Sequence, residues 1–394
     1  MPLTGVRVID LARVMAGPSC AQMLGDFGAD VIRVEDLQGD ETRRWFPVKN
    51  NQSPNYQSVN RNKRGIALNL KTDEGQKILH GLVKCSDVLL HAFLPSVARR
   101  LKVDYESMRA INPDLICCQV SGFGAKGEMT EKPGYDLMVQ AYAGIMDLTG
   151  DPDGPPMRAG ISTIDLSTGM LAVNGILLAL LARKSGKARG QNVNVSLLET
   201  SMALLAYHIT NYTIGDKKPR REGSGVGHIV PYQSFLCQDG YILAGATNDE
   251  AWQSFCRAID APDLAKDERF LTTHDRLRNK PSLIPLLQEI FATGRVEDWV
   301  ARLEEHRVPC APVRTLMSMV DDPQVRANDM IIETQSPDGV PLKLVGTPIK
   351  LSETPSSLRY APPRLGQHSD EVLSELLGYT PAQLASLRDS GVIG

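Results

Sequence analysis

The strongest constraint on the fold is the alternation of short apolar runs with helical patterns in the first third of the 394-residue chain. The runs of strand length are VRVIDL, DVIRVED, IALNLK, DVLLHAF and LICCQVSGFG. Segments with helical spacing of apolar residues separate most of them, namely SCAQMLGDFGA, EGQKILHGLVKCS and SVARRLKVDYESMRAINP, each read as one helix. Strands that alternate with helices form βαβ units, and parallel strands covered on both faces are apolar throughout. The sequence therefore predicts an α/β fold with a mostly parallel sheet.

The rest of the chain divides into further segments. From Gly134 the pattern is helical, as in YDLMVQAYAGIMDLTG, and GQNVNVSLL adds a strand. PYQSFLCQDGYILAGAT and IIETQSPDGVPLKLVG are typical of hairpins, and the tail from Pro362 predicts a pair of surface helices. We therefore expect a large domain in its N-terminal part (1–222), a smaller α+β domain (223–325) and a C-terminal return to the large domain (326–394).

The composition is that of a soluble globular protein. Apolar residues make up 42% of the chain, and the formal charge of −3 gives no basic field for nucleic acid or an anionic membrane. The seven cysteines form no CxxC pair and the seven histidines no HExxH pattern, so we expect neither disulfides nor a metal site. We expect no leader before the first strand, because the N-terminal residues show no basic and apolar signal pattern, and LAVNGILLALLA, interrupted by Asn174 and Gly175, is too short to span a bilayer. These features predict a cytoplasmic protein.

The first strand leads through a loop into a helix, in VIDLARVMAGPSCAQML. A helix N-terminus at this place can receive a phosphate, and Glu35 or Asp36 stands where a ribose ligand would be in a dinucleotide-binding unit. The loop MAGPSC, however, has one glycine where the GxGxxG pattern has three. The sequence therefore argues against NAD and a dehydrogenase.

Asp165 is the main candidate for chemistry. It stands in ISTIDLSTGML, at the start of a segment that is almost entirely apolar. The spacing from Ser162 to Asp165 fits a capping box, which would make Asp165 a structural residue. A carboxylate at a helix N-terminus is also expected to have a depressed pKa and to serve as an ionised nucleophile. Both interpretations remain open from the local sequence.

A third candidate is GSGVGHIVPY, residues 223–232, which has three glycines in its first five residues. Glycine is costly to order and suits places where backbone approaches a ligand. A flexible linker between the two domains explains the same composition.

Together these motifs resemble the class III CoA-transferases, the family that includes formyl-CoA transferase and carnitine CoA-transferase. The resemblance extends over essentially the whole chain. The motifs that carry it are GVRVIDLARVMAGPSCAQMLGDFGADVIRVE, SVNRNKRGIALNLK, INPDLICCQVSGFG, GYDLMVQAYAGIMDLTGDPDGPPMRAG, DLSTGM, GKARGQNVNVSLLE, GHIVPYQSF, VPCAPV and LGQH.

The resemblance implies roles for individual residues. Asp165 matches the nucleophile that forms an aspartyl anhydride and then an aspartyl-CoA thioester, and Gly225 and Gly227 match the segment expected to stabilise an oxyanion. Acyl-CoA is then a substrate, with neither metal nor NAD. The positions that match family contacts to CoA are Val14, Ala16, Leu68, Lys71, Phe93 and Arg100. Asp36 and Ala92 depart from the Arg and Asn of formyl-CoA transferase, so either Arg43 or Arg44 holds the adenosine end or the affinity for CoA is spread over other contacts.

The resemblance leaves the reaction and the acceptor open. The wording of VNRNKRG, MRAGISTIDLSTGM and GHIVPYQSF looks most like members that use short dicarboxylates such as succinate and glutarate. A second carboxylate would need an arginine, and Arg13, Arg43, Arg44 and Arg158 are the candidates. Family members that are racemases carry a histidine where Tyr135 stands here, and a phenol is a poor base at neutral pH. An α-methylacyl-CoA racemase and a non-catalytic CoA-binding scaffold are the alternatives to a transferase.

The family fold combines a large domain that has a Rossmann-like sheet with a small inserted domain. Two chains of the family interlock as linked rings, so the resemblance implies an interlocked homodimer. Long connections at residues 39–65 and 308–325 are compatible with such wrapping.

Overall fold

A computed structural model describes residues 1–394 of the chain. Its central feature is a six-stranded sheet in the order β3-β2-β1-β4-β5-β6, with every neighbouring pair parallel. The strands are β1 (Arg7–Asp10), β2 (Asp30–Glu35), β3 (Lys63–Ala67), β4 (Val88–His91), β5 (Ile116–Ser121) and β6 (Gln191–Ser196). The strand order reverses between β1 and β4, which in open α/β sheets is the point where ligands bind. The prediction of an α/β fold with a parallel sheet is confirmed.

The chain divides into two compact units. The large unit comprises residues 1–143, 159–209 and 324–394, and the small unit comprises residues 144–158 and 210–323. The chain passes into the small unit near residue 209, earlier than the expected boundary at 222, and returns near the expected place. Segment 144–158 also belongs to the small unit, which the sequence did not suggest because this segment adjoins helices of the large unit.

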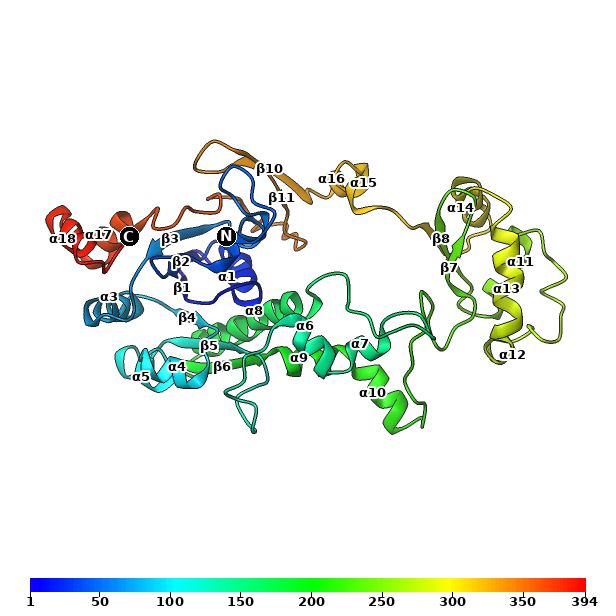
Figure 1. The fold of residues 1–394 in the computed structure, drawn as a ribbon, viewed down its shortest axis with the longest axis horizontal. Helices are drawn as coiled ribbons and strands as arrows, with labels where there is room; N and C mark the ends of the chain where they lie inside the picture. The colour runs from blue at the N-terminus through cyan, green and yellow to red at the C-terminus, as the bar shows by residue number, and fades with distance from the viewer. The chain divides into compact units, whose positions relative to one another are not determined.

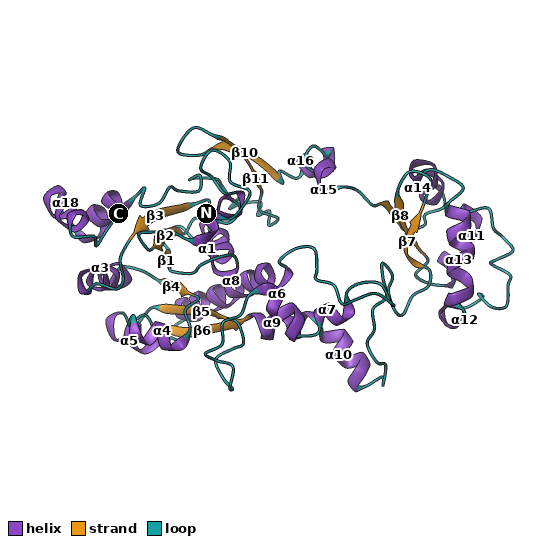
Figure 2. Ribbon diagram, in the orientation of Figure 1, coloured by secondary structure: helices purple, strands orange, loops and turns teal.

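Helices cover both faces of the parallel sheet (Figure 2). The large unit contains α1 (Ala16–Asp26), η1 (Glu41–Arg44), α2 (Pro54–Gln57), α3 (Asp73–Lys84), α4 (Pro95–Arg100), α5 (Tyr105–Ile111), α6 (Asp136–Tyr142), α8 (Thr163–Lys184), α9 (Leu197–Leu204), α17 (Ser369–Leu377) and α18 (Pro381–Asp389). Side chains from α3, α5, α17 and α18 form one core with the sheet, while α8 packs on α1, β5 and β6. Cys117 belongs to the first core and Cys118 is not part of it, as expected for neighbours in a strand.

The C-terminal segment completes the large unit. In Figure 1 the red helices α17 and α18 lie near β3 and α3, although they are about 300 residues away in sequence. The Nδ1 atom of His368 accepts a hydrogen bond from the backbone N–H of Gly65 at 3.0 Å, and Arg64 pairs with Glu371 and Glu375. A two-stranded antiparallel sheet of β10 (Ile331–Gln335) and β11 (Pro341–Val345) belongs to the same unit and confirms the second predicted hairpin.

The small unit has its own core, in which helices surround a three-stranded antiparallel sheet. Its strands are β7 (Tyr232–Leu236), β8 (Tyr241–Gly245) and β9 (Cys310–Pro312), and the β7–β8 pair confirms the first predicted hairpin. The helices in or at the edges of this unit are α7 (Ile145–Leu148), α10 (Ala206–Thr213), α11 (Asp249–Ala258), α12 (Thr273–Arg278), α13 (Lys280–Phe291), α14 (Val296–Glu305), α15 (Leu316–Met319) and α16 (Pro323–Ala327). Trp252, Phe255, Phe291 and Trp299 pack at its centre.

Two segments expected as single helices are broken. The first separates into α4 and α5, with Lys102 at a φ of 53° between them. The second separates into α6 and α7 at Gly144, which has a φ of 86°. Residues in the left-handed region cannot continue a right-handed helix, and the apolar spacing alone does not reveal them.

Helix α8 is longer than the apolar run suggested. It has 22 residues, and its most apolar 18-residue stretch has a mean hydropathy of 1.8, so the helix is long and apolar enough to cross a membrane. Within that stretch, 33% is buried inside the protein. A single helix of this kind is weak support for a membrane span, since core helices of soluble proteins meet the same criterion. The side chains of Met170, Leu178 and Leu181 are at least half exposed.

Candidate active site

Loops after the strands β1, β4 and β5 form a pocket at the switch point of the parallel sheet. The pocket has a volume of about 260 Å³, and Asp165 lies in its wall. The loop after β1 contributes Val14, the first turn of α1 contributes Ala16 and Gly17, and Tyr135 lines the pocket from the start of α6. The structure thus brings together five predicted site residues: Val14, Ala16, Phe93, Tyr135 and Asp165.

A larger pocket of about 790 Å³ lies beside the first one. Leu68, Lys71 and Arg100, all predicted to bind CoA, line it. Arg13 and Phe93 line both pockets, so the two spaces are adjacent in the large unit. The arrangement fits a long ligand whose reactive end reaches Asp165 and whose other end meets the cations Lys71 and Arg100.

Close packing of α8 on α1 positions Asp165 in the pocket. Gly169 lies one turn after Asp165, and a Cβ atom at Gly169 would be 2.3 Å from Ser19 Oγ and 2.7 Å from the carbonyl oxygen of Ala16. Any larger residue would therefore push α8 away from α1. The glycine of the DLSTGM motif explains how the carboxylate reaches the loop after β1.

The start of α8 is capped by a residue from another helix. Asp136 Oδ2 accepts hydrogen bonds from the backbone N–H groups of Ile164 at 2.9 Å and Asp165 at 3.0 Å. Gln140 donates to Asp136 Oδ1, and Gln140 Oε1 accepts from the N–H of Ala159 at 2.9 Å. Ser162 makes no side-chain capping bond, so of the two interpretations left open by the sequence the capping box is excluded. The cap comes from Asp136 and leaves the Asp165 carboxylate facing the pocket.

The electrostatic prediction for Asp165 is also wrong. Burial, together with the charge of Asp136, raises the pKa of Asp165 to about 7 instead of depressing it. The carboxylate of Asp165 has no ion-pair or hydrogen-bond partner within the chain to offset its desolvation. A buried, unpaired carboxylate is weakly solvated and correspondingly reactive when ionised.

Arg43 and Arg44 do not line either pocket. Arg43 forms a two-point contact with Glu35, at 2.9 and 2.6 Å, and its guanidinium lies 3.7 Å above the ring of Tyr56. Arg44 donates to the carbonyl oxygen of Gln38 at 2.7 Å. Asp36 lines the larger pocket and pairs with Arg13 at 2.8 Å. Arg13, which lines both pockets, is therefore better placed than Arg43 to bind a ligand.

Gly225 and Gly227 lie in the small unit, in the loop between α10 and β7. Neither glycine has a positive φ, and the carbonyl of Gly227 accepts a hydrogen bond from Lys217. Their predicted role as oxyanion donors beside Asp165 stays a prediction.

Sequence reasoning missed Asp136 and a group of buried charges beneath the loop after β1. Asp136 directly follows Tyr135 in the GYDL motif, but its capping of α8 depends on a contact between residues 28 positions apart. Arg33 and Lys63 carry a signal in the sequence, since each is a charged residue in or next to an apolar run of strand length, and both are buried in the structure.

The chain is similar to known proteins over nearly its whole length. The family model described as CoA-transferase family III matches residues 3–369. Human succinyl-CoA:glutarate CoA-transferase is 36% identical, and the alignment covers 100% of this chain and 90% of the human protein. Succinate–glutarate CoA-transferase of Agrobacterium fabrum is 37% identical, with 95% and 96% covered. A CaiB/BaiF family protein from Brucella suis has a solved structure that matches with a TM-score of 0.86 and 37% identity, covering 95% of this chain and 99% of that one. Such agreement in sequence, fold and coverage means that the chain belongs to CoA-transferase family III and is a CoA-transferase.

Proposed function

We propose that the protein transfers CoA from succinyl-CoA to a short dicarboxylic acid such as glutarate, with Asp165 as the nucleophile. The observation that carries this proposal is the unpaired, partly buried carboxylate of Asp165 in the wall of the smaller pocket. The adjoining larger pocket supplies Lys71 and Arg100 for the phosphate groups of CoA.

The reaction proceeds in two symmetrical halves. An Asp165 carboxylate oxygen attacks the thioester carbonyl of succinyl-CoA, the C–S bond breaks, and a mixed anhydride and CoA thiolate form. The thiolate attacks the aspartyl carbonyl, which releases succinate and leaves an aspartyl-CoA thioester. A glutarate carboxylate then attacks this thioester, which expels CoA thiolate and forms a second mixed anhydride between Asp165 and glutarate. The thiolate attacks the glutaryl carbonyl of this anhydride. Glutaryl-CoA forms, and the Asp165 carboxylate is regenerated.

Arg13 is our candidate for binding the second carboxylate of the acid. Of the four arginines considered from the sequence, only Arg13 lines the smaller pocket. Its salt bridge to Asp36 joins two half-exposed side chains, so the guanidinium keeps donors for a ligand. The two relatives named above, from human and Agrobacterium fabrum, carry glutarate in their names, and this supports the same choice here.

The racemase alternative has less support from the pocket. No histidine lines it, and Tyr135 is its single tyrosine. Asp165 could supply one acid–base group, but racemisation also needs a second group that exchanges a proton with the opposite face of the α-carbon, and a phenol is a poor base at neutral pH.

A panel of acceptor acids tests the proposed substrate. With succinyl-CoA as donor, kcat/KM for glutarate should exceed that for pentanoate, which has equal length and one carboxylate, by about tenfold or more. Arg13→Gln should narrow this difference. A preference for pentanoate, formate or carnitine would contradict the proposed acceptor while leaving CoA transfer itself in place.

We also propose that the protein is a homodimer with interlocked chains. The side chains of Leu178 and Leu181 on α8 are 67% and 62% exposed, and large apolar patches of this kind are typical of protein interfaces. The chain leaves the large unit near residue 209 and re-enters it near residue 324, so most of the small unit is inserted in the sequence of the large one, as in the family fold whose chains interlock. Residues 39–65 fold against their own sheet instead, through Glu35 and Arg43, and are less suited to wrapping than we expected.

The oligomeric state tests this part of the proposal. Sedimentation velocity should give a dimer at every concentration studied. Leu178→Lys, which places a charge in the apolar face of α8, should give monomer or aggregate. Leu271→Lys, at a half-exposed leucine of the small unit, is the matched control and should remain dimeric. An active wild-type monomer would rule out the interlocked dimer.

The proposed location is the cytoplasm, with small-molecule substrates and without nucleic acid or membrane partners. All seven cysteines are unpaired, which suits a reducing compartment.

A further inference from the structure

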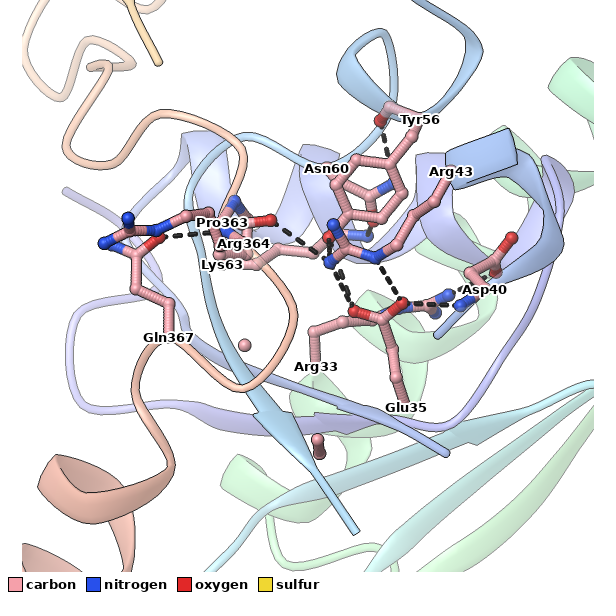
Figure 3. Close-up of polar contacts among 12 residues, drawn as sticks. Arg33, Glu35, Asp40, Arg43, Tyr56, Asn60, Lys63, Pro363, Arg364 and Gln367 are labelled. Atoms are coloured by element: carbon pink, nitrogen blue, oxygen red, sulfur yellow. Dashed lines mark hydrogen bonds and ion pairs between the residues drawn. The ribbon is translucent and has the colours of Figure 1, made fainter. Parts of the chain in front are cut away.

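Four buried charged residues lie beneath the loop that follows β1. We name Asp10, Arg33, Asp40 and Lys63 the buried charge cluster; each is at most 3% exposed. Asp10 Oδ2 lies 3.1 Å from the guanidinium of Arg33 and 3.0 Å from Lys63 Nζ, and Arg33 also pairs with Asp40 at 2.6 Å. Two positive and two negative groups thus form one connected network. Figure 3 shows Arg33, Asp40 and Lys63 of this cluster.

The cluster binds the backbone of the loop at three places and the first turn of α1 at a fourth. Asp10 Oδ1 accepts a hydrogen bond from Ala12 N–H at 3.0 Å, and Arg33 donates to the Ala12 carbonyl. Asp40 Oδ2 accepts from Val14 N–H at 3.2 Å, and Lys63 Nζ donates to the Pro18 carbonyl at 2.9 Å. The residues between these anchors are those that line the pocket with Asp165.

The anchored loop contains a strained residue. Val14 has a φ of 67°, in the left-handed region that a β-branched side chain strongly disfavours. Such a conformation costs about 1–3 kcal/mol and persists only where surrounding contacts impose it. The N–H of Val14 is the group that Asp40 binds.

A second layer of contacts fixes Asp40. Its backbone N–H donates to Glu35 Oε1 at 2.7 Å, and Glu35 is itself held by Arg43. Figure 3 shows this chain of contacts from Arg43 through Glu35 to the backbone of Asp40. Burial alone would raise the pKa of Asp40, but the charge of Arg33 and hydrogen bonds from Thr42 and Val14 hold it below the ordinary value. Asp40 is therefore anionic at neutral pH, and its contacts define the position of its carboxylate.

We propose that the buried charge cluster is a positioning device for the reaction, and that Asp40 is a positioning residue that holds Val14 in its strained conformation opposite Asp165. This inference rests on the proposed function of the pocket. Four buried charges carry a large desolvation cost, and well-packed apolar residues would stabilise the same region at least as well. The contacts instead specify one backbone conformation, in which the loop is shaped for the acyl-CoA ligand.

Asp40→Ala tests the proposal, with Asp26→Ala as the matched control. Asp26 forms an equally buried ion pair with Arg61 at 2.7 Å, at the other end of α1 and away from the loop. Both variants should unfold at lower temperature. Only Asp40→Ala should lower kcat/KM for acyl-CoA, by about 100-fold, and weaken CoA binding by about tenfold in calorimetry. Asp26→Ala should stay within about threefold of wild type.

A double-variant cycle separates positioning from general damage. If Asp40 serves to impose a positive φ at residue 14, glycine there removes the need for it. The loss in kcat/KM caused by Asp40→Ala should therefore be at least about tenfold smaller in the Val14→Gly background than in the wild-type background. The first is measured by comparing the double variant with the Val14→Gly single variant. Should Asp40→Ala not fold, Asp40→Asn keeps an acceptor oxygen for Val14 and should lose about tenfold.

Equal losses in the Asp40 and Asp26 variants, or no recovery by Val14→Gly, would overturn the inference. These outcomes are distinct from failure of the proposed function, which would appear as absence of CoA transfer in the wild type.

Discussion

Asp165→Asn is expected to lower CoA transfer by several orders of magnitude while the protein stays folded. The asparagine amide has nearly the same shape but cannot form the anhydride, so the covalent route is lost. The start of α8 should persist, because Asp136 provides its cap. CoA binding should also persist, because Lys71 and Arg100 lie in the other pocket. Steady-state kinetics and calorimetry with CoA measure the two effects separately.

The intermediate offers a second measurement. Wild-type protein incubated with succinyl-CoA and no acceptor should accumulate an adduct at Asp165, which hydroxylamine converts to a hydroxamate that peptide mass spectrometry can map. Asp165→Asn should give none. Substantial turnover by this variant, or an adduct on Asp136, would contradict the assignment of the nucleophile.

Asp165→Asn should also stabilise the fold at pH 8. Burial and the charge of Asp136 raise the pKa of Asp165 to about 7, whereas an unfolded aspartate titrates near ~3.9. The stability that the folded carboxyl contributes is therefore complete below pH ~4 and is lost as the pH rises through about 7. At pH 8 the free energy of unfolding of the variant should exceed that of wild type by about 2–4 kcal/mol, and the difference should vanish near pH 4. Denaturant unfolding at the two pH values checks this.

The sequence predicts the parts of the fold that depend on local pattern. Strands such as Val88–His91 and Ile116–Ser121 follow from continuous apolar runs, because a parallel strand buried on both faces has no polar side. The hairpins follow from their QDG and PDG turns. The pockets follow in turn, because loops after parallel strands meet at one edge of the sheet.

The remaining features depend on contacts between distant segments. The cap of α8 comes from Asp136, and Ser162, which local spacing favours, makes no capping bond. The pKa of Asp165 is set by burial and by the same Asp136, so a local argument from the helix N-terminus gave the wrong direction. Arg43 resembles a free surface arginine in the sequence, yet Glu35 binds it. Each of these side chains has a partner that the sequence pattern does not identify.

Asp136 is expected to control both the position and the acidity of Asp165. In the wild type, kcat/KM for acyl-CoA should fall about tenfold per pH unit below pH ~7, because protonation removes the nucleophile. Asp136→Asn keeps an oxygen for the two N–H groups of α8 but removes the like charge that raises the pKa of Asp165. The acid limb of the pH profile should therefore move to lower pH. The pH of its midpoint should still lie above the pKa of an ordinary aspartate, since burial is the larger cause of the raised pKa of Asp165.

Asp136→Ala removes the cap as well as the charge and should have the larger effect. Two N–H groups at the start of α8 lose their acceptor, at a cost of about 2–4 kcal/mol in stability. A shift of ~1 Å in Asp165 would lower kcat by about 100-fold. Asp104→Ala is the matched control, because Asp104 caps α5 through Ser107 N–H at 3.2 Å and lines neither pocket. It should lose stability but keep the wild-type kcat and acid limb. If Asp136→Ala and Asp104→Ala changed kcat equally, the effect would arise from lost stability alone. If the acid limb of Asp136→Asn stayed near pH 7, the charge of Asp136 would have no effect on the pKa of Asp165, and burial alone would raise that pKa.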